Sequence, residues 1–377
     1  MAVYALSFHA DYQCRHSGRC CTADWDVPVE VPVYRSLLEA LEGGRLRSPA
    51  GVLDPASGRA RGFITDPPAP DGAAAILERT DAGDCVFFDR GSRLCVVHRD
   101  LGETFLPATC RHFPRIAVRD RRGTFITLSH FCPTAASMLF RDDRAVEIVE
   151  SPPAFPPADY EGLAVGEDDW PPLLHSGVLM DPEGYAAWER HMVSQCADVF
   201  QAPESTLATL ARHAHLLRAW RPGTISLADA VRLLPLERVE GVSPASLDSS
   251  LGFCREASRA VPDELTPAPD EAGLDEAFRV LVAPRWTGFH PPLNRYLAAK
   301  AFASWTAYQG RGVLTIIRGL ECALSLVRVE AARRCRDAGR PLDAELLVEA
   351  FRAADFVLNH LAAGDELARL WSVAEHG

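Results

Sequence analysis

The stretch Cys110-Arg111-His112-Phe113-Pro114-Arg115, together with the adjacent pair Cys20-Cys21, is the strictest local pattern in this sequence. Seven of the eleven cysteines lie in the first 132 residues: Cys14, Cys20, Cys21, Cys85, Cys95, Cys110 and Cys132. In a reducing compartment, thiols gathered this densely are more readily explained as ligands for zinc or iron than as disulfides. The pattern therefore predicts a metal site near the start of the chain.

Length and composition predict a globular protein of at least two domains, because 377 residues with 47% hydrophobic content can bury a full core. The start of the chain lacks a basic region followed by an apolar run, and no apolar stretch approaches the roughly 18 residues of a membrane span. We expect a cytoplasmic protein with no membrane partner. The net charge of −12 argues against nucleic acid as a partner, since phosphate binding needs a basic surface.

Positive charge comes almost entirely from arginine, because Lys300 is the single lysine among 39 basic residues. A coding bias toward GC-rich codons explains this most simply. A second hypothesis is that an enzyme that modifies lysines avoids carrying lysines of its own.

The fold class that the sequence predicts is α+β: a small, irregular cysteine-cluster domain with short strands over 1–150, followed by a mainly α-helical domain over 151–377. The boundary is placed where proline pairs and acidic residues gather, over 150–172. In the first part we expect a helix over 32–41, a loop over 48–74, a hairpin joining 85–89 to 94–98, a strand over 124–128 and a helix over 134–140. In the second part, apolar periodicity predicts helices over about 182–199, 204–220, 226–234, 244–260, 271–282, 292–308, 312–336 and 343–361.

The cysteine spacing does not match a zinc ribbon or a bacterial ferredoxin run, so it leaves the metal open. On an extended backbone, Cys20 and Cys21 would point to opposite sides, which makes it hard for both to bind one mononuclear ion. A cluster would relax that limit if the backbone turned between them. Seven thiols exceed what a tetrahedral zinc or one four-iron cluster needs, so a subset of the seven is expected to ligate.

Histidines accompany several of these cysteines: His16, His98, His112 and His130 lie two or three residues from a cysteine. The favoured interpretation is that they orient or hydrogen-bond thiolates, with direct ligation as the alternative. The remaining cysteines, Cys196, Cys254, Cys322 and Cys335, lie in helical patterns and are interpreted as core or incidental residues.

A nucleophilic Cys110 is a second interpretation, because Arg111 and His112 could lower the pKa of its thiol. It ranks below metal ligation. The usual sequence motifs of serine hydrolases, P-loop nucleotide triphosphatases and dinucleotide-binding enzymes are absent from the chain.

Several segments resemble the zinc- or iron-chelating cysteine-cluster proteins, beginning with Cys14 to Cys21 and the residues around Cys85 and Cys95. The stretches from His98 to Arg115 and from Leu128 to Cys132 resemble more closely the flagellin lysine-N-methylase branch of that group. The segment Pro292-Leu-Asn294-Arg-Tyr296-Leu and the helices after it resemble the same branch.

This resemblance implies a bacterial enzyme that methylates protein lysines with S-adenosylmethionine and holds an iron–sulfur cluster, most simply 4Fe-4S, on its N-terminal cysteines. The acceptor would be a protein or peptide such as flagellin. A lysine amine attacks only when it is neutral, so such an enzyme must remove its proton or lower its pKa by desolvation. Glu103, Arg111 and Arg115 match the motif and either organise the site or brace the cysteine loops.

The chain departs from the branch in two ways: the spacing from Cys14 to Cys20-Cys21 is short, and His130-Phe-Cys132 replaces a Ser-Cys pair. Two other functions therefore stay open. The chain could be a non-catalytic zinc- or iron-binding or delivery protein, or a cluster protein that modifies a ribosomal peptide. The methyl-donor pocket and the catalytic residues are not indicated by any motif.

Overall fold

The computed structural model describes residues 1–23, 25–49, 62–66, 72–158, 160, 162–166, 169–242, 246–265 and 270–373. The chain divides into two compact units, and each is described by itself. The first is Met1–Tyr12 together with Ile116–Gly377, and the second is Gln13–Arg115. The smaller unit is thus inserted between two segments of the larger one.

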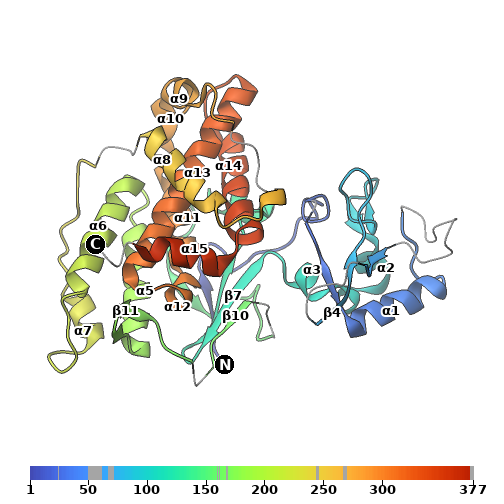
Figure 1. Ribbon diagram of the computed structural model, residues 1–377, viewed down its shortest axis with the longest axis horizontal. Helices are drawn as coiled ribbons and strands as arrows, with labels where there is room; N and C mark the ends of the chain where they lie inside the picture. The colour runs from blue at the N-terminus through green and yellow to red at the C-terminus, as the bar shows by residue number, and fades with distance from the viewer. Residues whose placement is uncertain are drawn as a thin grey trace. The chain divides into compact units, whose positions relative to one another are not determined.

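The inserted unit carries short strands and short helices around a small apolar core (Figure 1). Its elements are β2 (Pro28–Glu30), α1 (Val31–Glu42), β3 (Phe63–Ile64), β4 (Ala73–Leu77), β5 (Phe88–Asp89), β6 (Leu94–Cys95), α2 (Val96–Leu101), a 3-10 turn (Glu103–Phe105) and α3 (Ala108–His112). The strands form an antiparallel sheet in the order β2-β4-β3 and a separate β5-β6 hairpin. The helix expected over 32–41 and the hairpin are confirmed, although the hairpin strands are shorter and α2 begins at Val96. Most of the loop expected over 48–74 lies outside the described residues.

The larger unit has one five-stranded sheet in the order β10-β7-β8-β1-β9. Its strands are β1 (Val3–Leu6), β7 (Arg115–Asp120), β8 (Gly123–Leu128), β9 (Ile148–Glu150) and β10 (Gly162–Ala164), with a separate pair β11 (Leu173–His175) and β12 (Val178–Leu179). Strand β1 pairs parallel with β8, where Val3 faces Thr124, and antiparallel with β9. All six residues of β8 are buried, which fits a central strand.

The five-stranded sheet joins segments from both sides of the inserted unit, so the observed units differ from the predicted domains. The expected division at 150 and 151 differs from the observed units, because β1, β7, β8 and β9 all belong to one sheet of the larger unit. The pairing of Val3 with Thr124 is a long-range contact that local sequence patterns do not reveal. The protein is mixed in class, with small sheets and a helical C-terminal region, as expected in outline.

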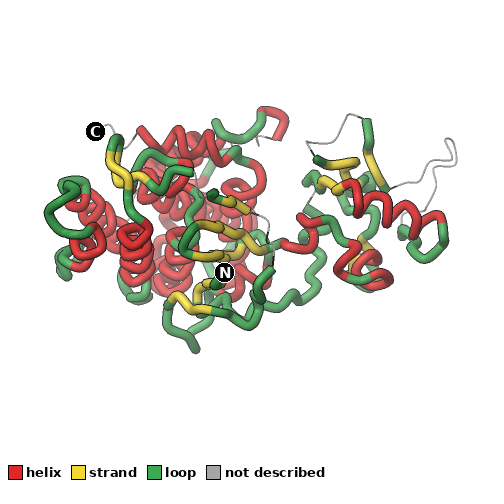
Figure 2. Tube along the Cα trace, turned by 90° about the horizontal axis from the view of Figure 1, so that it is seen from below, coloured by secondary structure: helices red, strands yellow, loops and turns green. Residues whose placement is uncertain are grey.

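Helices make up most of the larger unit (Figure 2). They are α4 (Pro133–Met138), α5 (Pro182–Cys196), α6 (Pro203–Leu217), α7 (Leu227–Arg232), α8 (Leu247–Ser258), a 3-10 turn (Asp263–Leu265), α9 (Leu274–Ala277), a π-helical segment (Phe278–Val282), α10 (Ala283–Trp286), a 3-10 turn (Thr287–Phe289), α11 (His290–Ala301), α12 (Thr306–Gln309), α13 (Val313–Ala338), α14 (Ala344–Phe356), a second π-helical segment η5 (Val357–Leu361) and α15 (Gly364–Trp371). Helix α13 packs against α8 and α14 along its length, and the three lie side by side in Figure 1. Its Arg328 is 1% exposed and ion-pairs with Glu204 of α6.

Helix α5 begins as its sequence predicts. The Asp181 carboxylate accepts a hydrogen bond of 2.6 Å from the Gly184 backbone N–H, and Pro182 occupies the first turn. The stripe of Tyr185, Trp188 and Met192 is buried in the main core. Among the described residues, no helix is both long and apolar enough to cross a membrane.

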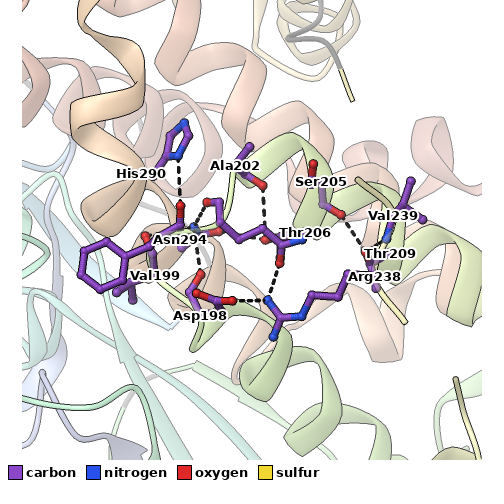
Figure 3. Close-up of polar contacts among 12 residues, drawn as sticks. Asp198, Val199, Ala202, Ser205, Thr206, Thr209, Arg238, Val239, His290 and Asn294 are labelled. Carbon is purple, nitrogen blue, oxygen red and sulfur yellow. Dashed lines mark hydrogen bonds and ion pairs between the residues drawn. The ribbon is translucent and has the colours of Figure 1, made fainter. Parts of the chain in front are cut away.

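The turn between α5 and α6 is held by Asn294 of α11, a residue of the segment Pro292 to Leu297 (Figure 3). The Asn294 side chain is fully buried. Its amide donates to the backbone carbonyls of Gln201 at 2.7 Å and Val199 at 3.4 Å, and its oxygen accepts from the Thr206 hydroxyl at 3.1 Å. Asn294 therefore has a structural role in positioning α6 against α11.

Replacing Asn294 with alanine is expected to lower the free energy of unfolding by about 2–4 kcal/mol, because buried carbonyls and a hydroxyl would lose their partner. Urea denaturation followed by far-UV circular dichroism measures this. His290→Ala is the matched control, since His290 is partly exposed and makes one hydrogen bond, to the Phe200 carbonyl at 3.3 Å. Equal losses in the two variants would contradict the assigned role of Asn294.

Candidate functional site

The Cys20-Cys21 pair lies in a turn and not on extended backbone. The Cys21 N–H donates to the Gly18 carbonyl at 3.0 Å, and Gly18 has φ +73°, with the Phe88 ring where a Cβ would lie. The two sulfur atoms are 3.9 Å apart. The expectation that the two side chains diverge is therefore wrong, because the turn brings both thiols to one side.

Three further cysteines of the inserted unit lie in the same apolar cluster. Cys85 is tied to the pair through its backbone N–H, which donates to the Cys21 carbonyl at 2.7 Å. Cys95 ends β6 and pairs with Phe88 in the hairpin, while Cys110 lies on α3. Cys21, Cys95 and Cys110 are half-buried against a core that includes Cys85, Val86 and Phe87. We expected the hairpin to bring Cys85 close to Cys95; the observed hairpin strands contain Cys95 but not Cys85, which lies three residues before Phe88 and forms a bridge with Arg79.

The five thiols lie close enough to perturb one another. Burial is the main cause of raised thiol pKa values at three of these cysteines. It raises the pKa of Cys85 to about 12, and it also raises the pKa of Cys95 and, well above its ordinary value, that of Cys110. Repulsion from neighbouring thiolates adds to each of these shifts. A hydrogen bond from the Cys21 thiol lowers the pKa of Cys20, and the same contact raises the pKa of Cys21. Each thiolate formed here makes it harder for the next thiol to lose its proton. A bound cation would offset this repulsion and lower the thiol pKa values.

Thiols are the kind of ligand that zinc and iron prefer. The described side chains do not, however, form a complete set of ligands around one point. Two thiolates on one tetrahedral zinc lie about 3.8 Å apart, given Zn–S bonds of about 2.3 Å. The Cys20 to Cys21 separation of 3.9 Å is close to that value. Over the described residues, however, no group of three or more His, Cys, Asp or Glu side chains is placed so that it could hold a metal ion.

Cys14 is exposed, whereas the other five cysteines of the inserted unit are half-buried or buried. Its sulfur accepts a hydrogen bond of 3.4 Å from the His16 N–H, and the rings of His16 and His98 are 6.3 Å apart between centroids. His112 is the last residue of α3, two residues after Cys110. Of the four histidines noted in the sequence, these three belong to the inserted unit.

Cys132 belongs to the larger unit, where it precedes α4 and is buried. Its sulfur lies 3.6 Å from the Tyr12 hydroxyl. Of the four cysteines expected in helices, Cys196, Cys322 and Cys335 are buried and Cys254 is half-buried. None of the eleven cysteines, all within the described residues, forms a disulfide.

A second polar centre, which the sequence patterns did not indicate, surrounds Asp355 in the larger unit. The Asp355 carboxylate is fully buried and accepts from the His130 backbone N–H at 2.6 Å, the His130 Nδ1 at 3.1 Å and the Tyr296 hydroxyl at 2.7 Å. Lys300 forms an ion pair with it at 2.5 Å. His130 thus belongs to this network, and its Nε2 lies 3.3 Å from the Nε2 of His9.

The protonation of this centre follows from burial and charge. The Lys300 ammonium and the hydrogen bond from His130 hold the pKa of Asp355 below its ordinary value despite burial. Burial lowers the pKa of His130, of His9 and, to about 4, of His360. Near neutral pH the centre therefore contains one ion pair and uncharged imidazoles. The sequence drew attention to His130, Tyr296 and Lys300 separately, but it did not indicate that they meet at Asp355, because they come from segments far apart in the chain.

Stability is expected to fall as the pH drops from about 6.5 toward 4. Between the unfolded and folded pKa values of these histidines, the unfolded chain binds more protons than the folded one. Each histidine held neutral contributes a slope of up to about 1.4 kcal/mol per pH unit in this window. Urea midpoints at pH 7.5 and pH 5.0 measure the effect, and a midpoint unchanged between them would contradict it.

Comparison of the chain with protein-family models, with curated proteins and with solved structures finds no match.

Proposed function

We propose that this chain is a protein lysine N-methyltransferase-like enzyme that uses S-adenosylmethionine and carries an iron–sulfur cluster on its N-terminal cysteines. The 4Fe-4S type is proposed first. The acceptor would be a protein or peptide, flagellin among the candidates, and the setting would be the bacterial cytoplasm. The family resemblance of the segments around Cys110 and Cys132 suggests the reaction.

The observation that carries the proposal is that Cys21, Cys85, Cys95 and Cys110 lie in or against one apolar cluster of the inserted unit, with the Cys20 sulfur 3.9 Å from that of Cys21. These five residues would supply the ligands, and Cys14 is the remaining cysteine of the inserted unit; Cys132, the seventh cysteine predicted from the sequence, belongs to the larger unit. The cluster, when bound, would supply electron-rich iron beside the methyl donor. The protein's own contribution is a largely buried pocket of soft donors that keeps water from the sulfur atoms.

The lone lysine agrees with a lysine-modifying activity. Lys300 has 15% of its side chain exposed and is paired with Asp355, so the chain presents no freely exposed lysine among its described residues. An amine held as an ammonium by a carboxylate is a poor nucleophile. Self-methylation would therefore be slow, and an acceptor assay would have little background.

A non-catalytic zinc-binding or zinc-delivery protein is the second candidate. The 3.9 Å separation of the Cys20 and Cys21 sulfur atoms favours it, because neighbouring thiolates at that distance suit a single tetrahedral ion. A third candidate, modification of a ribosomal peptide, shares the cluster and differs in the acceptor.

Anaerobic purification with iron, acid-labile sulfide and zinc quantified per chain tests the proposal. The expected result is iron and sulfide in similar amounts, a broad visible absorption that bleaches on reduction, and binding of S-adenosylmethionine in calorimetry. Stoichiometric zinc without iron would select the second candidate. Protein that binds neither iron nor S-adenosylmethionine would overturn the methyltransferase proposal.

Methyl transfer is then followed with isotope-labelled S-adenosylmethionine and flagellin. Lys300→Arg serves as the background control, because it removes the one possible acceptor within the chain while keeping a cation beside Asp355. Label on flagellin with either enzyme form supports the proposed activity. Transfer to a short ribosomal peptide and not to flagellin would select the third candidate.

A further inference from the structure

A pocket in the larger unit lies beside Lys300, away from the cysteine cluster in sequence and assigned to no function above. Residues from α11, α13, η5 and α15 line it, with the segment that follows α11. Its polar lining includes Lys300 and Asn359, and its apolar walls include Phe302, Leu320, Trp305 and Trp371. All of these residues belong to one unit, so the pocket is complete within it.

The pocket offers hydrogen-bond donors in excess of acceptors. The Lys300 ammonium carries three N–H groups, more than its ion pair with Asp355 needs. The Asn359 Nδ2 is buried without a hydrogen-bond partner. The hydroxyls of Ser304 and Thr306 bond to each other at 2.6 Å, and that of Thr127 donates to the Ala299 carbonyl at 3.1 Å. An acceptor atom bound in this pocket would give the Asn359 amide the partner it lacks and would have Lys300 among its neighbouring donors.

Charge restricts what that acceptor can be. The Lys300 ammonium is already neutralised by its ion pair with the Asp355 carboxylate. A carboxylate ligand would therefore add an unpaired negative charge near the buried Asp355. An ammonium ligand would be repelled by Lys300. A neutral carbonyl group avoids both penalties.

We propose that this pocket binds a small, uncharged carbonyl compound whose oxygen accepts hydrogen bonds from Lys300 and Asn359. Its hydrocarbon part would contact the apolar walls formed by Phe302, Leu320 and the two tryptophans. The rings of Trp305 and Trp371 are stacked, 6.0 Å apart between centroids, and both line the pocket. The site is independent of the methyltransferase proposal, since it uses none of the cysteines.

The single lysine makes the test direct. The rate of Lys300 acetylation by a water-soluble acylating reagent is measured by mass spectrometry, relative to the N-terminal amine of the same chain. Three probes share one carbon skeleton and differ in charge: isobutyramide, isobutyrate and isobutylamine. Taking the rate as a ratio corrects for reagent consumed by the amine probe.

Isobutyramide is expected to slow Lys300 acetylation about twofold at a concentration equal to its dissociation constant, on the order of 10 mM for so small a ligand. Isobutyrate and isobutylamine at the same concentration are expected to leave the ratio unchanged. Protection by isobutyrate equal to that by isobutyramide would overturn the proposal, and so would protection by none of the three.

Asn359→Ala provides the matched variant, because it removes the unpartnered donor and leaves the Lys300–Asp355 ion pair in place. It is expected to weaken isobutyramide protection about fivefold, corresponding to one lost hydrogen bond. Far-UV circular dichroism and the urea midpoint confirm that the variant is folded. Unchanged protection in the folded variant would overturn the proposed role of Asn359 and with it the site.

Discussion

Replacing Asp355 with alanine is expected to destabilise the larger unit by about 3–5 kcal/mol, the cost of leaving a mostly buried charge without its partner. Lys300 would lose its counter-ion, and His130 and Tyr296 would each lose an acceptor. The free energy of unfolding from urea titration at pH 7.5 measures the change.

A second variant separates the effect of charge from that of packing at Asp355, and a variant of a surface ion pair serves as the control. Asp355→Asn keeps the shape and one acceptor but removes the charge, so it is expected to lose less stability than alanine. Glu276→Ala is the surface control: Glu276 is 65% exposed and pairs with Arg279 three residues away, so its loss is expected to cost less than about 1 kcal/mol. A loss below about 1 kcal/mol for Asp355→Ala would mean that the ion pair does not hold this core together.

Replacing Cys20 and Cys21 together with serine is expected to weaken metal binding by more than about 100-fold, beyond what changes around a metal ligand usually cost. The hydroxyl of serine is a far poorer donor for zinc or iron than a thiolate. Metal per chain after gel filtration and the visible spectrum measure the loss.

Cys196→Ser is the matched control for the cysteine pair. Cys196 is buried in α5 within the main apolar core of the larger unit, and it is not among the seven proposed ligands, so it serves as a core cysteine for comparison. Its variant should keep the full metal content. Metal retained by the double variant, or lost by Cys196→Ser, would remove the cysteine pair from the proposed site.

Local structure was predictable wherever it depends on neighbouring residues. Asp181-Pro182 predicts the start of α5 because both residues act within one turn, and alternation around Gly91 predicts the β5-β6 hairpin. The turn at Cys20-Cys21 was missed because it depends on Gly18 adopting a positive φ beside the Phe88 ring. That contact joins two segments that no periodicity connects.

Long-range features were beyond the reach of sequence patterns for the same reason. The Asp355 centre joins His9, His130 and two residues of α11, Tyr296 and Lys300, and although His130 and Tyr296 lie in segments that carry the family resemblance, nothing in the sequence connects them to Asp355. The sequence pattern of an amphipathic helix does not show whether a single aspartate in it faces solvent or a buried lysine. The two compact units differ from the predicted division at 150 for a similar reason, since the partner of β1 lies beyond the whole inserted unit.

The insertion also sets an order of events during synthesis. The inserted unit ends at Arg115, so all of its cysteines leave the ribosome before Thr124, the residue that pairs with Val3. Because domains fold as units while the chain grows, the inserted unit could take up the proposed metal on a nascent chain whose first strand has not yet met its partner. Metal supply would then act on this protein at translation, before the helical unit exists.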